Sequence, residues 1–221
     1  MNANNVKYRE TINVKSQKNF FYNFLKRLLD IIGSTLGIII FSPIFLLVSI
    51  AIKIEDPKGK IIFGHKRVGL KGEEFKCWKF RSMVHNAEEV LSNLSPEQKK
   101  EYSETFKLKN DPRITKVGNF IRKTSLDELP QLINILVGEM SIVGPRPIVT
   151  KELDFYGEYA QYLKTVKPGL TGLWQVSGRS DTTYEERVDL DMEYIIKRNT
   201  VLDIYIILMT VIKVIKREGA C

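Results

Sequence analysis

The feature that most constrains this chain is an uncharged apolar run from Ile31 to Ile52. A straight helix over this run would be about 33 Å long, which is enough to cross a bilayer. Pro43 lies near the middle of the run, directly after Ser42, and a proline there removes a backbone hydrogen bond and bends a helix. The run therefore predicts a membrane helix with a break at Ser42-Pro43.

Basic residues flank both ends of this run. Lys26 and Arg27 precede it, and the residues after it include Lys53, Lys58, Lys60, Lys66 and Arg67. Because an excess of Lys and Arg marks the cytoplasmic side of a membrane, both ends are expected on that side. A re-entrant helix satisfies this, with each limb reaching roughly 15 to 18 Å into the bilayer, and a plain spanning helix is the alternative. Asp30 is placed to pair with Lys26 or Arg27 at the interface.

Charge and cysteine content narrow the class of partner. The net charge of +8 is typical of proteins that bind nucleic acid, anionic lipid or an anionic substrate. The apolar run favours the last two, and no basic motif interleaved with aromatic residues indicates nucleic acid. The two cysteines, Cys77 and Cys221, form neither a zinc spacing nor a disulfide framework, which favours a reducing cytosolic location. The apolar run is too long and begins too late for a signal peptide.

We expect an α+β, helix-dominated fold with a small β element. Residues 1–20 form a basic arm, residues 21–54 the re-entrant helix, and residues 55–221 one catalytic domain. Short strands are predicted at Ile61–Phe63 and Phe75–Phe80, on either side of a glycine-containing turn.

Several helices have start signals or apolar periodicity of their own. Ser95 and Pro96 mark one helix start, and a second helix covers residues 183–198. Ser125 resembles a capping-box residue that opens a helix running to about Leu136, although Pro130 favours a start one or two residues later. A last helix, Leu202–Ile215, is amphipathic. Its apolar face is predicted to pack on the core, with contact to lipid as the alternative.

Adjacent carboxylates, Asp127 and Glu128, are the candidate catalytic groups. Acidic residues at a helix start often only stabilise the helix. Here, however, Arg122, Arg146 and Arg179 lie in the same region or in rigid Gly- and Pro-containing loops, and arginine matches the geometry of phosphate oxygens. A carboxylate among arginines is expected to stay ionised, so that Asp127 could bind Mg²⁺ or attack phosphorus. The pattern indicates phosphoryl transfer at a membrane surface.

Six motifs in this order resemble the bacterial sugar transferases, the monotopic polyprenyl-phosphate phosphoglycosyl transferases. They extend over about residues 20–220. The motifs are Lys26-Arg27-Leu28-Leu29-Asp30, Ser42-Pro43, Lys79-Phe80-Arg81-Ser82-Met83, Ser125-Leu126-Asp127-Glu128-Leu129-Pro130-Gln131-Leu132, Val143-Gly144-Pro145-Arg146-Pro147 and the segment Pro168 to Arg179. The chain resembles the minimal catalytic form of the family.

The resemblance implies a specific reaction. A sugar-1-phosphate passes from a UDP-sugar to undecaprenyl phosphate through a phosphosugar-aspartyl intermediate at Asp127, and UMP is released. The product would begin capsule, exopolysaccharide, O-antigen or glycoprotein glycan synthesis. The resemblance also implies Mg²⁺ at Asp127, support from Glu128, and phosphate or nucleotide contacts from Arg122, Arg146 and Arg179.

The resemblance also implies a place in the cell. The enzyme would be monotopic on the cytoplasmic face of the bacterial membrane. Lys26, Arg27, Asp30, Ser42 and Pro43 would form its anchor, with membrane lipid as a partner and a homodimer left open.

Two other functions fit the same residues. A membrane-bound nucleotide-sugar diphosphate hydrolase would use water as acceptor and need Asp127 only as a metal ligand. A non-enzymatic membrane-docking module would need neither carboxylate. The sequence does not identify the sugar, the glycan pathway or the role of the basic arm.

Overall fold

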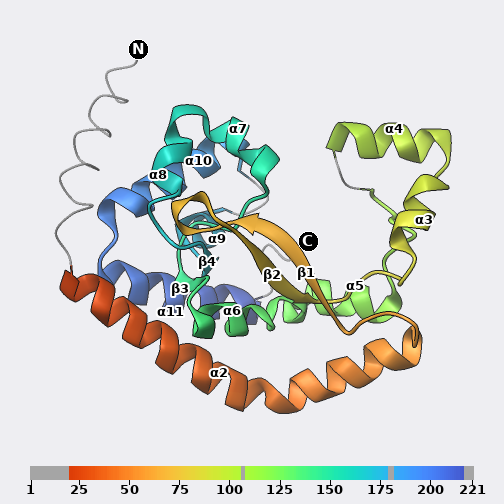
Figure 1. Ribbon diagram of the computed structural model, residues 1–221, viewed down its shortest axis with the longest axis horizontal. Coiled ribbons are helices and arrows are strands. Elements are labelled where there is room, and N and C mark those ends of the chain that lie inside the picture. The colour runs from red at the N-terminus through yellow and green to blue at the C-terminus, as the bar shows by residue number, and fades with distance from the viewer. Residues whose placement is uncertain (1–19, 106–107, 179–181, 217–221) are drawn as a thin grey trace.

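The computed structural model describes residues 20–105, 108–178 and 182–216, and it confirms a helix-dominated α+β fold (Figure 1). The basic arm before Phe20, together with Arg179 and Cys221, lies outside the described residues. The elements in chain order are α2 (Phe20–Glu55), β1 (Ile62–Val68), η1 (Leu70–Gly72), β2 (Glu74–Phe80), α3 (Ala87–Ser92), α4 (Pro96–Thr105), α5 (Lys116–Lys123), η2 (Leu126–Glu128), α6 (Gln131–Val137), β3 (Ser141–Val143), η3 (Thr150–Glu152), α7 (Leu153–Tyr156), η4 (Gly157–Tyr159), α8 (Ala160–Leu163), β4 (Gly169–Thr171), α9 (Leu173–Ser177), α10 (Tyr184–Lys197) and α11 (Thr200–Lys216).

Helix α2 runs along one edge of the molecule and bows around it (Figure 1). It is long and apolar enough to cross a membrane, by length and composition. It stays helical through Pro43, so the predicted break is a bend within a continuous helix. The Ser42 hydroxyl donates to the Ile39 carbonyl at 2.8 Å, in the turn that Pro43 interrupts.

Polar contacts fix the first limb of α2 to the rest of the domain. Lys26 Nζ lies 2.9 Å from Asp203 Oδ2 in α11. Arg27 donates to the carbonyls of Ile135 and Leu136, at the C-terminal end of α6. The predicted pairing of Asp30 with these cations is wrong. Asp30 Oδ1 instead accepts hydrogen bonds from β3, because the helix packs against that strand.

The second limb of α2 is fixed to the same domain. Val48 and Ile52 pack in a buried cluster with Phe80 and Ile121. Beyond the apolar run, Glu55 accepts hydrogen bonds from the backbone amides of Lys116 and Val117 at the start of α5. Both ends of α2 are therefore held by one domain.

Strands β1 and β2 form the predicted hairpin, with Ile62 opposite Phe80 and Val68 opposite Glu74. Strand β1 is longer than predicted because it continues to Val68. Buried Asn134 of α6 accepts from Trp78 N and donates to the Lys76 carbonyl, and so holds β2 against α6. A second small sheet pairs β3 and β4 in parallel.

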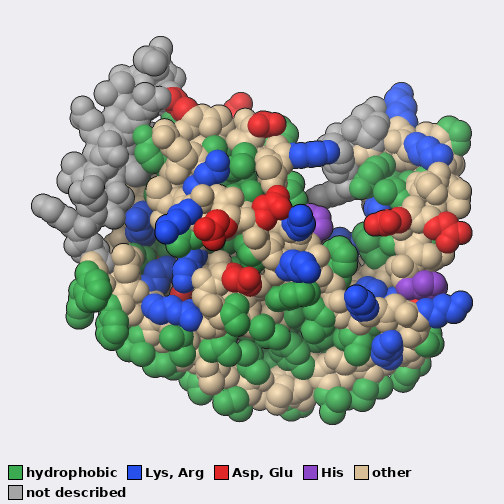
Figure 2. Space-filling view, viewed as in Figure 1, with side chains coloured by type: hydrophobic (Ala, Val, Ile, Leu, Met, Phe, Trp, Pro, Cys, Tyr) green, Lys and Arg blue, Asp and Glu red, His purple; other side chains and the backbone are tan. Residues whose placement is uncertain are grey.

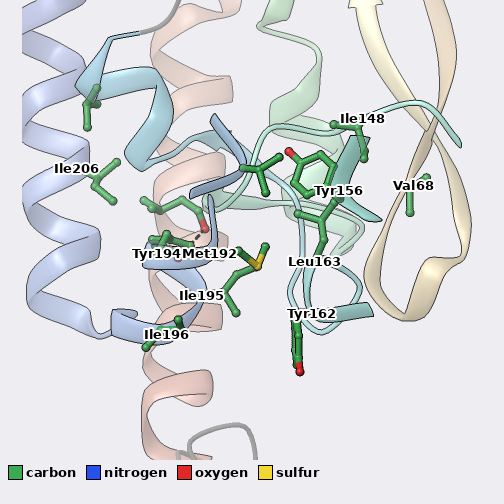
Figure 3. Packing of buried hydrophobic residues seen from close by; sticks show 13 residues of the cluster. Val68, Ile148, Tyr156, Tyr162, Leu163, Met192, Tyr194, Ile195, Ile196 and Ile206 are labelled. Atoms are coloured by element: carbon green, nitrogen blue, oxygen red, sulfur yellow. Dashed lines mark hydrogen bonds between the residues drawn. The ribbon is translucent and has the colours of Figure 1, made fainter. Parts of the chain in front are cut away.

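The largest buried cluster lies where α7, α8, α10 and α11 meet β3. Figure 3 shows Tyr156, Leu163 and Ile148 together with Met192 and Ile195 of α10. The cluster includes Val143 of β3 and Ile148 of the loop that follows it, so it packs against the segment that carries Arg146.

Two helix starts are confirmed. The Ser95 hydroxyl accepts from Gln98 N at the start of α4, and Thr183 forms a capping box with Glu186 at the start of α10. Helices α3 and α4 stand apart from the rest of the molecule (Figure 1).

Helix α11 packs on the core as predicted, through Ile206 and Ile207. Most of the apolar face predicted for this contact is turned outward, however, and that part of the prediction is wrong. Ile204, Leu208 and Val211 are 46%, 59% and 52% exposed, whereas Ile206 is fully buried. The helix is rotated because Asp203 is drawn inward to Lys26. Its exposed apolar side leaves the lipid alternative open.

Candidate active site

The candidate carboxylates, Asp127 and Glu128, lie in a short 3₁₀ turn, η2, between α5 and α6. Ser125 precedes them with φ 56° and ψ 16°, a left-handed conformation that is rare for a residue with a side chain. The predicted capping box at Ser125 is wrong. Its side chain makes no capping hydrogen bond, and α6 begins only at Gln131, after Pro130. Backbone strain of this kind is often held at functional sites.

Asp127 is 9% exposed, and its burial dominates its electrostatics. Burial raises its pKa, and the neighbouring Glu128 raises it further, while Lys79, Arg122 and Arg146 act in the opposite direction. The expectation that Asp127 stays ionised among the arginines remains a prediction, but its pKa lies above the ordinary value of 3.8. The cost of desolvating the carboxylate exceeds the stabilisation by the cations.

Lys79 is a site residue that the sequence analysis did not assign. It lies on β2, and its Nζ is 2.6 Å from Glu128 Oε1 and 3.8 Å from Asp127 Oδ2. A single cation thus bridges both carboxylates. The residue belongs to one of the quoted motifs, but its distance of 48 positions from Asp127 hid the contact, which only the packing of β2 on η2 creates.

Two of the three predicted arginines, Arg146 and Arg122, lie near the carboxylates in the structure. Arg146 Nη1 lies 3.7 Å from Glu128 Oε1, and its side chain is 39% exposed. Arg122, in the last turn of α5, acts on Asp127 through its charge. Arg179 lies outside the described residues. Two of the three are thus placed near the carboxylates.

A small pocket opens beside these groups, between the hairpin and the loop after β3. Arg67, Cys77 and Lys79 line it from the hairpin, and Glu128, Gln131 and Arg146 face them. Arg67 and the buried Gln131 were also missed. Gln131 lies four residues after Asp127. Arg67 shares one face of β1 with His65, whose cross-strand partner is Cys77.

Close backbone contact fixes the loop that carries Arg146. Gly144 N donates to Thr171 O, and Gly169 N donates to Pro145 O, both at 2.8 Å. A Cβ atom on Gly169 would lie 2.1 Å from Gly144 N, so a larger residue does not fit there. The glycines and prolines of both motifs therefore hold Arg146 beside the pocket, as the sequence pattern predicts.

The carboxylates have the donor atoms that Mg²⁺ prefers. Among the described residues no group of three His, Cys, Asp or Glu side chains is placed to hold a metal ion. Mg²⁺, however, commonly binds one or two carboxylates together with substrate phosphates and water. Asp127 and Glu128 fit that smaller donor set, provided that the substrate supplies phosphate oxygens.

Comparison with known proteins gives consistent matches. A model of the family described as bacterial sugar transferase matches residues 21–217. An undecaprenyl-phosphate galactose phosphotransferase of Salmonella typhimurium is 52% identical over 200 residues, covering 89% of this chain and 42% of the relative. An uncharacterized sugar transferase of Haemophilus influenzae is 52% identical over 199 residues, with the same coverage.

A shorter relative matches along most of its length. The exopolysaccharide production protein ExoY of Rhizobium meliloti is 44% identical over 198 residues, covering 88% of this chain and 87% of the relative. The chain thus spans less than half the length of the first two relatives and nearly all of the third.

Proposed function

This chain belongs to the bacterial sugar transferase family, and from that premise we propose that it transfers a sugar phosphate from a UDP-sugar to undecaprenyl phosphate. The observation that carries the proposal is the buried carboxylate of Asp127, beside Lys79 and Glu128 at the edge of a cationic pocket. Relatives named for galactose and glucose phosphotransfer to undecaprenyl phosphate support the donor and acceptor classes.

The reaction would proceed in two displacements at phosphorus. An Asp127 carboxylate oxygen bonds to the phosphorus that bears the sugar, and the bond from that phosphorus to the oxygen bridging to UMP breaks. UMP leaves with the electron pair. An oxygen of the lipid phosphate then attacks the same phosphorus, and the carboxylate of Asp127 is restored.

The surrounding side chains suit this chemistry. Lys79 and Arg146 would offset the negative charge of the diphosphate, and their positions are set before substrate arrives. Both reacting oxygens, on Asp127 and on the lipid phosphate, are already anionic, so neither displacement requires a general base. Glu128 can accordingly act by positioning Lys79, which donates to its Oε1 at 2.6 Å. Bound Mg²⁺, held by Asp127 and Glu128, would supply further charge neutralisation.

The arrangement of α2 supports a re-entrant topology. Lys26 at one end and Glu55 at the other make polar contacts with the same domain. A spanning α2 would require one of these contacts to break or the charged domain to enter the bilayer, and burying charge in lipid is costly. Apolar side chains gather along the outer edge that α2 forms, with charged groups above it (Figure 2). We propose that this edge lies in the cytoplasmic leaflet.

The reaction is tested by mixing purified protein and Mg²⁺ with a panel of UDP-sugars and measuring UMP release with and without undecaprenyl phosphate. Lipid-dependent release with one sugar is expected, and Asp127→Asn should abolish it. Asp189→Asn, which removes an exposed carboxylate from α10, is the matched control. Sustained release without lipid would favour the hydrolase. Full activity of Asp127→Asn would refute the assignment of Asp127 as the nucleophile.

The topology is tested with labels placed near Asn19 and near Lys58. Accessibility of both labels from one side of the membrane is expected. Accessibility from opposite sides would show a spanning helix. A non-enzymatic docking module makes a different prediction. Its membrane binding would be unchanged by substitution of Arg146 and weakened by substitution of exposed lysines.

A further inference from the structure

Arg67 is a cation of the pocket that the proposed reaction has not used. It projects from β1, and its side chain is 23% exposed. Its Nη1 lies 3.4 Å from Glu152 Oε2, which is longer than most N–H···O hydrogen bonds. This is the one hydrogen bond that its guanidinium makes within the described part of the chain. Because a guanidinium has five N–H donors, Arg67 is held in place and still has donors to offer.

Glu152 is fixed by other groups than Arg67. Its Oε2 accepts from Val149 N at 2.8 Å, which caps η3. Its Oε1 lies 3.5 Å from the Tyr184 hydroxyl and 3.8 Å from Arg187 Nη1. The carboxylate therefore stays in position whether or not Arg67 contacts it.

Arg187 supplies a second, permanently buried charge behind Glu152. It is 7% exposed, and its Cζ lies 4.7 Å from the Trp174 ring centroid and 5.1 Å from that of Tyr184. Two arginines thus share the Glu152 carboxylate, and Arg187 has a second carboxylate nearby, because its Nε lies 3.9 Å from Asp191 Oδ2. Burial lowers the pKa of Arg67, and repulsion from the positive charge of Arg146 lowers it further. An anion placed between these two arginines would relieve that repulsion and would therefore be stabilised there.

Strand register places Arg67 at the end of the pocket far from Asp127. Lys79, which contacts both catalytic carboxylates, is opposite Phe63. Phe63 and Arg67 are four residues apart on one face of β1, which separates them by roughly 13 Å along the strand. Arg146 contacts Glu128 and also acts electrostatically on Arg67, so it lies between the two ends.

We propose that Arg67 binds the phosphate of the departing nucleoside monophosphate, with Glu152 as its positioning residue. This rests on the proposed function. When the diphosphate's reacting phosphorus is at Asp127, its second phosphate extends toward Arg146 and Arg67. The electron pair of the broken P–O bond stays on an oxygen of that second phosphate. Arg67 offsets the charge there, and it contributes both to binding the donor and to departure of the product.

The test measures the affinity of the purified, detergent-solubilised protein for UMP by calorimetry, alongside kcat and KM for UMP release. Arg67→Gln should weaken UMP binding at least 10-fold and lower kcat/KM, while Arg67→Lys should recover part of the affinity. Lys66→Gln is the matched control. It removes the same charge from the preceding residue of β1, whose side chain is 75% exposed, and it should leave both quantities unchanged.

A second variant separates positioning from folding. Glu152→Gln keeps an oxygen that can accept from Val149 N but removes the charge between the two arginines. It should raise the KM for the donor and the Kd for UMP about 3- to 10-fold, whatever its effect on Tm. A merely structural ion pair would lower Tm and leave UMP affinity as it was.

The outcomes separate this inference from the proposed function. Unchanged UMP affinity in Arg67→Gln, or equal weakening in Lys66→Gln, would overturn the role of Arg67 even if the wild-type protein transfers sugar phosphate. Absence of UMP binding to the wild-type protein would overturn it as well. Conversely, UMP binding that depends on Arg67 would support the site even if no donor in the panel released UMP.

Discussion

Asp203 is expected to be among the most sensitive positions for stability, because it joins three helices through one buried carboxylate. It is 3% exposed. Its oxygens accept from Tyr22 Oη at 3.0 Å, from Lys26 Nζ at 2.9 Å and from Tyr194 Oη at 2.8 Å. Asp203→Ala would leave the ammonium of Lys26 and two buried hydroxyls without this acceptor. Removing one partner of a buried ion pair costs about 3–5 kcal/mol.

A surface pair provides the matched comparison. Lys197 Nζ lies 2.7 Å from Glu193 Oε1 in α10, but the side chains are 63% and 41% exposed. Glu193→Ala should therefore cost less than about 1 kcal/mol, although the contact is shorter than that of Lys26 with Asp203. The two variants should differ in cost because Asp203 is buried and accepts from three donors, whereas solvent replaces the partner that is lost at the surface.

The assay is thermal and denaturant unfolding of both variants in the same detergent. For a chain of this size 1 kcal/mol shifts Tm by about 2–4 °C, so Asp203→Ala should lower Tm by roughly 6–20 °C. Lys26→Met should cost less in the Asp203→Ala background than in the wild type, since the pair is already broken. Similar losses for Asp203→Ala and Glu193→Ala would refute the reasoning.

Three further predictions concern other sites. Burial raises the pKa of Asp191 from 3.8 to about 6, so the folded state holds a proton that the unfolded state releases. The free energy of unfolding should therefore fall by about 3 kcal/mol as pH rises between these two values. Asp191→Asn should remove this fall in unfolding measured from pH 4 to 8. Gly118→Ala would place a Cβ atom 2.0 Å from the Ser82 carbonyl oxygen, and unfolding experiments should show a loss of about 1–3 kcal/mol or more. Lys79 lowers the pKa of Asp127, so in Lys79→Met the acid limb of the pH profile of kcat/KM should move to higher pH; an unmoved limb would show that Asp127 does not titrate there.

Much of the fold could be predicted because its signals are local. The apolar run defines α2, the alternation around the glycine-containing turn defines the hairpin, and hydroxyl caps mark the starts of α4 and α10. Each of these depends on residues a few positions apart. The face of α11 was not predictable in this way, because its rotation follows from Asp203 meeting Lys26 of α2, 177 positions away.

The sequence analysis named the two carboxylates and two of the arginines that the structure brings together, but not the residues that surround them. Lys79, Arg67 and Gln131 come to the pocket through packing of the hairpin on η2 and α6. The left-handed Ser125 has no clear sequence signal, since serine at that position also fits a capping box. The raised pKa of Asp127 likewise depends on burial, which the density of nearby arginines does not reveal.

The same packing connects the membrane helix to the chemistry. Arg27 of α2 holds the C-terminal end of α6 through the carbonyls of Ile135 and Leu136. Buried Asn134 of α6 binds the backbone of β2, the strand that carries Lys79, and the turn that carries Asp127 lies just before α6. Helix α6 thus sets the positions of both Asp127 and Lys79 relative to α2. The proposed acceptor is a phosphate held at the lipid surface, and such an arrangement suits it, because the proposed nucleophile, if it stood on a mobile domain, would have to find that phosphate anew in each turnover.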